Sequence, residues 1–349
     1  MTVSNDLPGG TSTVDRAPDL ASTRPAMRRR PWLQALLPVV LVAIMAVLGL
    51  VLQASPLLTL QEVLALVVLA TATNLLLGGG GVVSFGQGVF YGVGAYTVAL
   101  GWLHWQLSFW LTFFLAPFVG AALAVPIGLV ALRARRLYFA LSTLAFSELA
   151  YQLAESRYSF TKGANGVFGP FVPASLTNPV TGYFFLLAVT VVSLLLLWKV
   201  NHSPFGLVLR AIRENRERMQ ALGVNVYRHQ LAAFVISGFF CSLAGAMFVV
   251  YSQSAYPELL DWTTSGAPVF MAVIGGMGVF LGPAAGAFIY QFGHDELVRY
   301  VDDWQLVLGG VLLLIVMFWP DGLLGTYARV RWGAIRRRRS SGGEEDSDG

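Results

Sequence analysis

Few side chains in this sequence have the types and spacing that chemistry requires. A catalytic site needs a convergent nucleophile, acid–base or metal set. The four histidines are instead scattered among predicted loops and helix ends: His104, His202, His229 and His294. The single cysteine, Cys241, lies in an apolar run, so there is no disulfide or zinc spacing. The group His294–Glu296 is typical of a solvated face. The sequence therefore predicts no enzyme activity, no metal site and no cofactor.

One uncharged stretch concentrates glycine and amide side chains: NLLLGGGGVVSFGQGVFYGVGAYTVAL, residues 74–100. Gly86, Gly88 and Gly92 superficially match a dinucleotide-binding loop. That motif also needs a preceding strand and an acidic residue about twenty positions later, and no acidic residue occurs between Glu62 and Glu148. A phosphate-binding Gly-Lys-Ser/Thr sequence is absent as well. This chain is therefore expected to bind no nucleotide itself.

The same stretch is compatible with close packing of membrane helices. Gly88 and Gly92 lie on one helical face, where small residues let neighbouring backbones approach. The run Gly78–Gly81 predicts either a broken, re-entrant helix or a short cytoplasmic turn, because four glycines do not hold a regular helix. Irregular backbone at membrane depth is tolerated where it is buried or lines a cavity. Three nearby polar residues favour a substrate pathway: Asn74, Ser84 and Gln87.

Glu148 is the clearest acidic residue inside an apolar segment. Ionisable residues at membrane depth are costly and are often functional. Glu148 would meet a substrate ammonium group if it faced the pathway. An equally good interpretation is a structural hydrogen bond to a neighbouring helix.

The elements that must position these residues are membrane helices. Of the 349 residues, 56% are hydrophobic and 12% are charged, and mean hydropathy is +0.64. A soluble domain has about twice that charged fraction, and a spanning helix needs about 20 apolar residues. The sequence predicts an all-α polytopic membrane protein with about ten transmembrane or re-entrant helices. The predicted spans are 32–52, 57–77, 82–103, 108–132, 138–153, 181–200, 231–252, 264–281, 283–299 and 304–319.

Basic residues predict the orientation, because they favour the cytoplasmic ends of spans. With ten crossings and both termini cytoplasmic, 20 of the 23 basic residues lie inside. Three parts result from this scheme. Residues 1–31 form a disordered cytoplasmic segment, residues 32–325 form the membrane domain, and residues 326–349 form a disordered cytoplasmic tail, first basic and then acidic.

A predicted cytoplasmic segment, residues 203–223, has the pattern of an amphipathic helix. Ser203 and Pro204 are typical of an N-cap and first helical position, and Gly223 of a helix end. An apolar stripe that includes Phe205 and Ile212 is opposed by a face of mixed charge. Such a helix lies on lipid or docks into a groove of a partner. The mixture of acids and bases favours a partner.

Several separated stretches resemble the LivM-like permease subunits of branched-chain amino acid ABC transporters. They include residues 74–100, LYFALSTLAFSELAYQLA followed by TKGANGVFG, residues 203–248, MAVIGGMGVFLGP and PDGLLG. The resemblance extends from Asn74 to Gly325. It adds Gly275 and Gly276 to the expected helix-packing positions. It departs from the family at Gln87, where many members have histidine, and in the unusually basic segment around Arg216 and Arg218.

The resemblance implies an ATP-driven importer in the bacterial inner membrane. It implies a second related permease, two cytoplasmic ATPases and an external binding protein as partners, besides membrane lipid, and no nucleic acid. The resemblance implies that residues 203–223 form the coupling segment, the part of a permease that contacts the ATPase. The implied contact residues are Phe205, Ile212, Glu214, Ala221 and Gly223. Glu258 and Asp261 lie in an outer loop and are either contacts for the binding protein or ordinary solvated residues.

Two other functions stay open at this stage. Related permeases carry urea, short amides or other amino acids, and nothing in the sequence reports the size of the substrate. A secondary transporter would couple transport to ions through buried acids, and the scarcity of acids in the predicted spans disfavours it.

Overall fold

The computed structural model describes residues 43–52, 54–134, 137–300 and a few positions between 306 and 322. The described residues from Met45 onward belong to one compact unit, which is distinct from residues 1–44. Most of the predicted spans 304–319 and 32–52 and both terminal segments lie outside the described residues. The position of the termini therefore stays a prediction.

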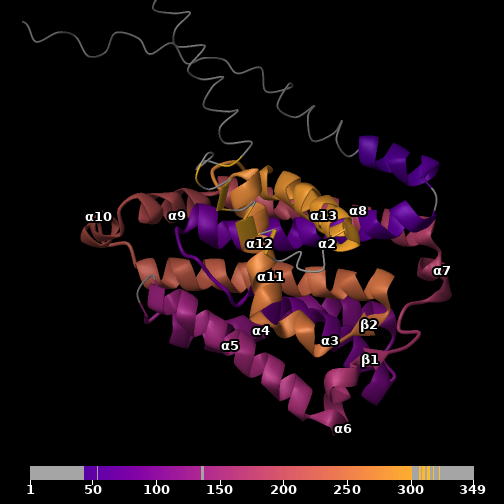
Figure 1. Cartoon of the computed structure of the whole chain (residues 1–349). Coiled ribbons are helices and arrows are strands. Elements are labelled where there is room, and N and C mark those ends of the chain that lie inside the picture. The colour runs from indigo at the N-terminus through magenta and orange to yellow at the C-terminus, as the bar shows by residue number, and fades with distance from the viewer. Residues whose placement is uncertain are drawn as a thin grey trace, which may run out of the picture. The chain divides into compact units, whose positions relative to one another are not determined.

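Helices make up most of the described chain, as expected for an all-α protein (Figure 1). The long helices are α2 (Ala54–Asn74), α3 (Gln87–Trp105), α4 (Phe109–Ala131), α5 (Leu137–Ser156), α8 (Pro179–His202), α11 (Val226–Ser252), α12 (Trp262–Gly275) and α13 (Gly282–Tyr300). The short helices are η1 (Leu75–Gly79), α6 (Tyr158–Thr161), η2 (Gly163–Asn165), α7 (Ala174–Thr177), α9 (Pro204–Glu214), α10 (Arg216–Ala221) and η3 (Pro257–Leu260). The strands β1 (Val167–Phe168) and β2 (Ser254–Ala255) pair antiparallel.

Four helices of the described chain are long and apolar enough to cross a membrane: residues 55–79, 109–131, 179–202 and 226–252. Two predicted spans need correction. The span 82–103 becomes helical only at Gln87, and the span 264–281 ends as α12 at Gly275. At about 1.5 Å per residue, the 14 residues of α12 reach only ~21 Å, short of a ~30 Å hydrocarbon layer. Residues 82–86 and 276–281 are apolar, so hydropathy assigned them to these spans although they are not helical.

The long helix α11 lies at the centre of the unit. It packs against α3 and α4 on one side and against α2 on another, while α8 and α13 pack on α2 (Figure 1). Of the most apolar stretch of α2, 94% is buried inside the protein, whereas the corresponding share is 39% in α4 and in α8. The exposed apolar side chains of α4 and α8, such as Phe118 and Leu195, are suited to contact lipid. The helices that carry the polar residues thus lie inside, where a pathway requires them.

Glycines bring the central backbones into contact. A Cβ at Gly94 of α3 would overlap the carbonyl of Ser242, and one at Gly245 of α11 would overlap the carbonyl of Tyr91. Neither Gly94 nor Gly245 was among the predicted packing positions.

The predicted packing glycines are also in tight places. A Cβ at Gly275 would overlap the carbonyl of Gly282, where α12 meets α13, and Gly276 has a φ of 106°. At Gly92 a Cβ would lie within 2.6 Å of Leu260 Cγ. Small residues therefore set the distances between helices throughout the core.

Candidate functional site

The helix that begins as α2 breaks at the four glycines. Its last turn widens into the π-helix η1, in which the N–H of Gly80 reaches the carbonyls of Leu75 and Leu76. Gly81 then has a φ of 65°, a conformation that other residues rarely adopt. The chain runs without regular structure to Gln87, where α3 begins, and Ser84 is buried within this segment. Single π-turns are frequent at functional sites.

Two helices hold the irregular segment in place. Thr143 Oγ1 of α5 accepts a hydrogen bond from the N–H of Phe85 at 3.1 Å, and Ser147 Oγ donates to the carbonyl of Phe85 at 3.1 Å. Ser147 Oγ also lies 2.9 Å from Ser265 Oγ of α12. Ser265 Oγ in turn accepts from the N–H of Gly88 at 2.8 Å. These side chains satisfy backbone groups that a regular helix would otherwise pair.

The starts of α3 and α12 meet at this point. A Cβ at Gly88 would lie 2.8 Å from the carbonyl of Asp261, the N-cap of α12. The Asp261 carboxylate accepts from the N–H of Trp262 at 2.6 Å, so it caps α12. Helix starts at membrane depth occur at the substrate sites of many transporters. Of the two acids predicted in the outer loop, Asp261 thus has a structural role, and Glu258 is exposed.

Removing the hydroxyl of Ser265 is expected to destabilise the break. In Ser265→Ala the buried N–H of Gly88 loses its acceptor, which costs about 1–3 kcal/mol. Thermal unfolding of the purified full chain in detergent checks this. Ser142→Ala is the matched control, because Ser142 Oγ donates only to Tyr138 of its own helix. Equal unfolding temperatures for the two variants would contradict the role given to Ser265.

Gln87 lies fully buried where α2, α3 and α11 meet. Its Oε1 is 3.2 Å from Cys241 Sγ and 3.3 Å from Ser237 Oγ, and Ser237 Oγ donates to the carbonyl of Ala72 at 2.8 Å. Gln87 Nε2 has no hydrogen-bond partner among the described residues. Buried donors almost always have a hydrogen-bond partner, in the protein or in ordered water. The donor of Gln87, by contrast, is unpaired within the described part of the chain.

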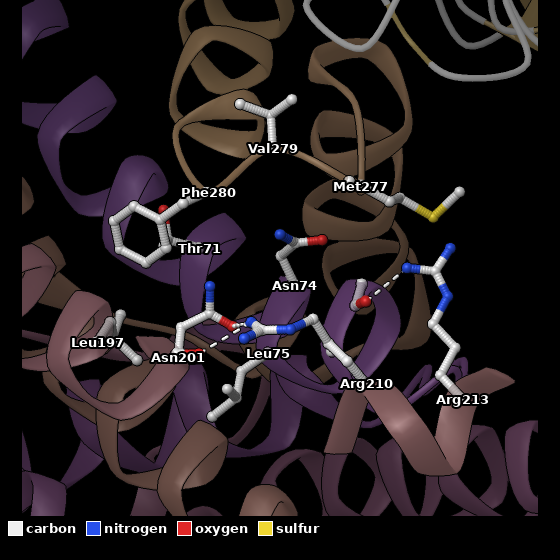
Figure 2. Close-up of a pocket in the computed structure, with 13 residues that line it drawn as sticks. Thr71, Asn74, Leu75, Leu197, Asn201, Arg210, Arg213, Met277, Val279 and Phe280 are labelled. Atoms are coloured by element: carbon white, nitrogen blue, oxygen red, sulfur yellow. Dashed lines mark hydrogen bonds between the residues drawn. The ribbon is translucent and has the colours of Figure 1, made fainter. Parts of the chain in front are cut away.

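A cavity of about 90 Å³ lies where η1, α8, α9 and the α12–α13 loop meet (Figure 2). Asn74 and Thr71 line it, and each has a buried side-chain oxygen with no partner among the described residues. Arg210 and Arg213 of α9 line it as well. Arg213 Nη1 donates to the carbonyl of Gly78 at 2.5 Å. The irregular segment therefore contacts α9 through Arg213 and α5 through Thr143 and Ser147.

Glu148 lies apart from this arrangement. Its carboxylate is half-buried on α5 and accepts from Gln152 Nε2 of the same helix at 2.8 Å. A second acid, Glu62, is half-buried on α2. Sequence reasoning gave Glu62 no role.

The serines of α11 and α12 were also missed. Ser237 and Ser265 are both buried and both hydrogen-bonded across helices. Small polar residues in apolar helices are the available sequence signal for such contacts.

The coupling segment is two helices rather than one. Ser203 caps α9 with Pro204 at its first position, as predicted, and Gly223 has a φ of 83° beyond α10. Asn215 breaks the helix with φ −152° and ψ 99°, and its side chain caps α10. The sequence did not reveal this break because Asn215 stands among charged residues that continue the amphipathic pattern.

The two faces of the coupling segment have different surroundings. Ile212 is 3% exposed, and Phe205 packs on the core with its ring stacked on that of His229. Glu214, Ala221 and Gly223 are exposed. The surface available to a partner is therefore the α9–α10 corner.

The fold and the polar break define a class, the polytopic membrane permeases. The family model described as "Branched-chain amino acid transport system / permease component" matches residues 55–317, and the chain belongs to this family. The family and the apolar helices place it among the multi-pass proteins of the bacterial inner membrane. No solved structure matches the chain.

Several curated proteins are similar to this chain. The high-affinity branched-chain amino acid transport system permease protein LivM of Salmonella typhimurium is 29% identical over 285 residues, which cover 74% of this chain and 67% of the relative. The probable LivM of Methanocaldococcus jannaschii is 25% identical over 54% of this chain and 59% of the relative. The ribose import permease protein RbsC of Haemophilus influenzae is 26% identical over 36% of this chain and 41% of the relative.

Proposed function

We propose that this chain is the membrane-spanning permease subunit of an ATP-driven ABC importer for branched-chain amino acids. The observation that carries the proposal is the family match over residues 55–317. The similarity to permeases named for branched-chain amino acid transport covers 74% of the chain, whereas the similarity to a ribose permease covers 36%. The family match and these similarities are all to transport proteins, which is consistent with a chain that transports and does not itself catalyse a reaction.

The proposed assembly follows from what the chain lacks and from its family. ATP hydrolysis takes place in two separate cytoplasmic ATPase subunits, because the sequence has no phosphate-binding loop. A second, related permease completes the pathway, and an external binding protein delivers the substrate. Membrane lipid surrounds the exposed apolar faces of α4 and α8.

The proposed pathway uses the polar residues at the broken helix. Gln87 Nε2 and Asn74 Oδ1 are buried and free to bind a ligand, and Ser84 lies in the irregular segment between them. Glu148 is assigned to the periphery of this pathway, since its carboxylate is engaged with Gln152. Gly88 and Gly92 let α3 approach η3 and α12 closely enough to enclose it.

The proposed coupling runs through α9. The ATPase contacts Glu214, Ala221 and Gly223 at the exposed corner, while Phe205 and Ile212 fix α9 to the body of the permease. A movement of α9 then reaches the break directly, because Arg213 is hydrogen-bonded to Gly78. A ligand or partner shifts such an equilibrium only by its differential affinity for the two states. ATP binding by the partner supplies that difference in alternating access.

Uptake of a substrate panel tests this function. Proteoliposomes with the complete transporter and its binding protein are expected to accumulate leucine, and excess isoleucine and valine are expected to compete. Urea, acetamide and ribose should neither accumulate nor compete. Transport of urea or acetamide in place of leucine would replace the proposed substrate with the short-amide alternative, and transport of neither would contradict the importer assignment.

A further inference from the structure

The cavity beside η1 has an unusual supply of positive charge. Arg210 and Arg213 both line it from α9. Arg210 Nη1 donates to Asn201 O at 2.9 Å and to Asn201 Oδ1 at 3.2 Å, and Arg213 Nη1 donates to Gly78 O. In the described part of the chain, neither guanidinium has a carboxylate within salt-bridge distance. The remaining N–H groups of both arginines are therefore suited to an anion, and a guanidinium binds a carboxylate in a bidentate manner.

The same cavity also holds oxygen atoms that an anion alone would not satisfy. Asn74 is 8% exposed and Thr71 is 3% exposed, and the described residues leave Asn74 Oδ1 and Thr71 Oγ1 without partners. Asn74 points into the cavity between Phe280 and Met277 (Figure 2). A carboxamide oxygen only accepts hydrogen bonds. Its partner must be a donor, such as an ammonium group.

Size and lining complete the description of the ligand. The volume of about 90 Å³ is several times the ~10–15 Å³ that one water needs on such a measure. Apolar side chains form the remaining wall: Leu75, Leu197, Met277, Val279 and Phe280. Convergent polar groups on an otherwise apolar wall are typical of a small-molecule site. The combination suits a small ligand with an anionic end, a donor end and an aliphatic part.

We propose that this cavity binds a zwitterionic α-amino acid on the coupling-segment side of the permease. Arg210 and Arg213 contact its carboxylate, Asn74 Oδ1 and Thr71 Oγ1 contact its ammonium group, and the aliphatic side chain lies toward Val279 and Phe280. The inference deepens the proposed function, on which it rests, by giving the transported amino acid a release site. Arg213 and Gly78, which are hydrogen-bonded to each other, both line the site. Binding of the amino acid is therefore linked to the position of α9.

Protection of an introduced thiol tests the site. Met277→Cys in the purified full chain, held in nanodiscs, places a reactive group at the rim of the cavity. The native Cys241 is fully buried and gives the background rate in the unmodified chain. L-Leucine is expected to slow alkylation by N-ethylmaleimide in a saturable manner. Leu222→Cys, on an exposed loop away from the cavity, is expected to show no protection.

Ligand analogues separate the two halves of the site. 3-Methylbutylamine lacks the carboxylate, and 4-methylpentanoate lacks the ammonium group. Each is expected to protect about tenfold or more weakly than leucine, the effect of losing about 1.4 kcal/mol of binding. Inorganic phosphate serves as the simple anion. Protection by phosphate or by 4-methylpentanoate equal to that by leucine would overturn the ammonium contact, and equal protection by 3-methylbutylamine would overturn the carboxylate contact.

Variants assign the contacts to residues. Arg210→Gln is expected to weaken protection by leucine at least about tenfold, since a charge-assisted contact is lost. Asn74→Ala should weaken protection by leucine while leaving that by 4-methylpentanoate unchanged. Arg216→Gln is the matched control, because Arg216 is exposed on α10 and does not line the cavity. Arg210→Lys retains the charge if the glutamine variant does not fold.

Failure of the release site and failure of the proposed importer function give different experimental results. Absence of leucine protection in Met277→Cys, together with normal leucine uptake by the complete transporter, would overturn the release site and leave the importer intact. Uptake of urea without uptake of leucine would instead overturn the proposed function. Wild-type protection in Arg210→Gln would overturn the assignment of the carboxylate contact.

Discussion

Replacing Gly245 with alanine is expected to prevent stable packing of the central helices. The new Cβ would overlap the carbonyl of Tyr91, and its other neighbours are the Tyr91 carbonyl carbon at 2.7 Å and the Ala95 nitrogen at 3.1 Å. All are backbone atoms, so no side chain can rotate away and α3 must separate from α11. Overpacking costs about 1–3 kcal/mol and occasionally more. We expect the cost here at or above the upper end, because these two helices form the middle of the core.

The yield of monodisperse full chain in detergent and its unfolding temperature measure this effect. Gly266→Ala is the matched control. Gly266 is also a buried helical glycine, but its added Cβ would lie 3.6 Å from the Phe270 ring, an ordinary contact. We expect near-normal yield for Gly266→Ala and little or no folded protein for Gly245→Ala. Wild-type yield and uptake in Gly245→Ala would mean that α3 and α11 are not in backbone contact.

Reversing the charge of Glu214 is expected to uncouple the permease from its ATPase. Glu214 is the last residue of α9 and is exposed, and such surface changes alter folding stability by only about ±0.5 kcal/mol. A like charge across an interface costs several kcal/mol. Glu214→Arg should therefore be expressed normally, lose most co-purification of the ATPase, and abolish stimulation of ATP hydrolysis by loaded binding protein.

Glu258→Arg provides the matched control for that reversal. Glu258 is equally exposed but lies in η3, beyond α11, whose 27 residues extend about 40 Å at 1.5 Å per residue. ATPase co-purification should be unchanged in Glu258→Arg. If Glu214→Arg retains both the ATPase and its stimulation, the α9–α10 corner is not the docking surface.

Local patterns in the sequence predicted the helical elements well. Hydropathy predicted α4 and α8 within two residues at either end, because long apolar runs have no competing interpretation. The cap at Ser203 and Pro204 was confirmed, since capping depends on residues adjacent in the chain. Asn215 shows where such local patterns fail. Its role as a break between α9 and α10 could not be distinguished from a helical asparagine on a charged face.

The candidate site depends on contacts between residues far apart in the sequence. Ser147 and Ser265 are separated by 118 positions, and Arg213 and Gly78 by 135. A serine in an apolar helix indicates a hydrogen bond but not its partner. The glycine run predicted a break, whereas its direction, from α9 back toward α5 and α12, emerges only from the packing of the helices. Asn74, Ser84 and Gln87 could therefore be proposed from the sequence, and Arg210 could not be placed beside them.

Energised uptake by the reconstituted protein tests the central claim most directly. Vesicles with the chain, its partner permease, the two ATPases and loaded binding protein are expected to accumulate leucine only when ATP is supplied to the ATPases. An imposed proton or sodium gradient without ATP should give no accumulation. If the chain alone, without any ATPase, drives leucine uptake down an ion gradient, it is a secondary transporter and the importer account is wrong.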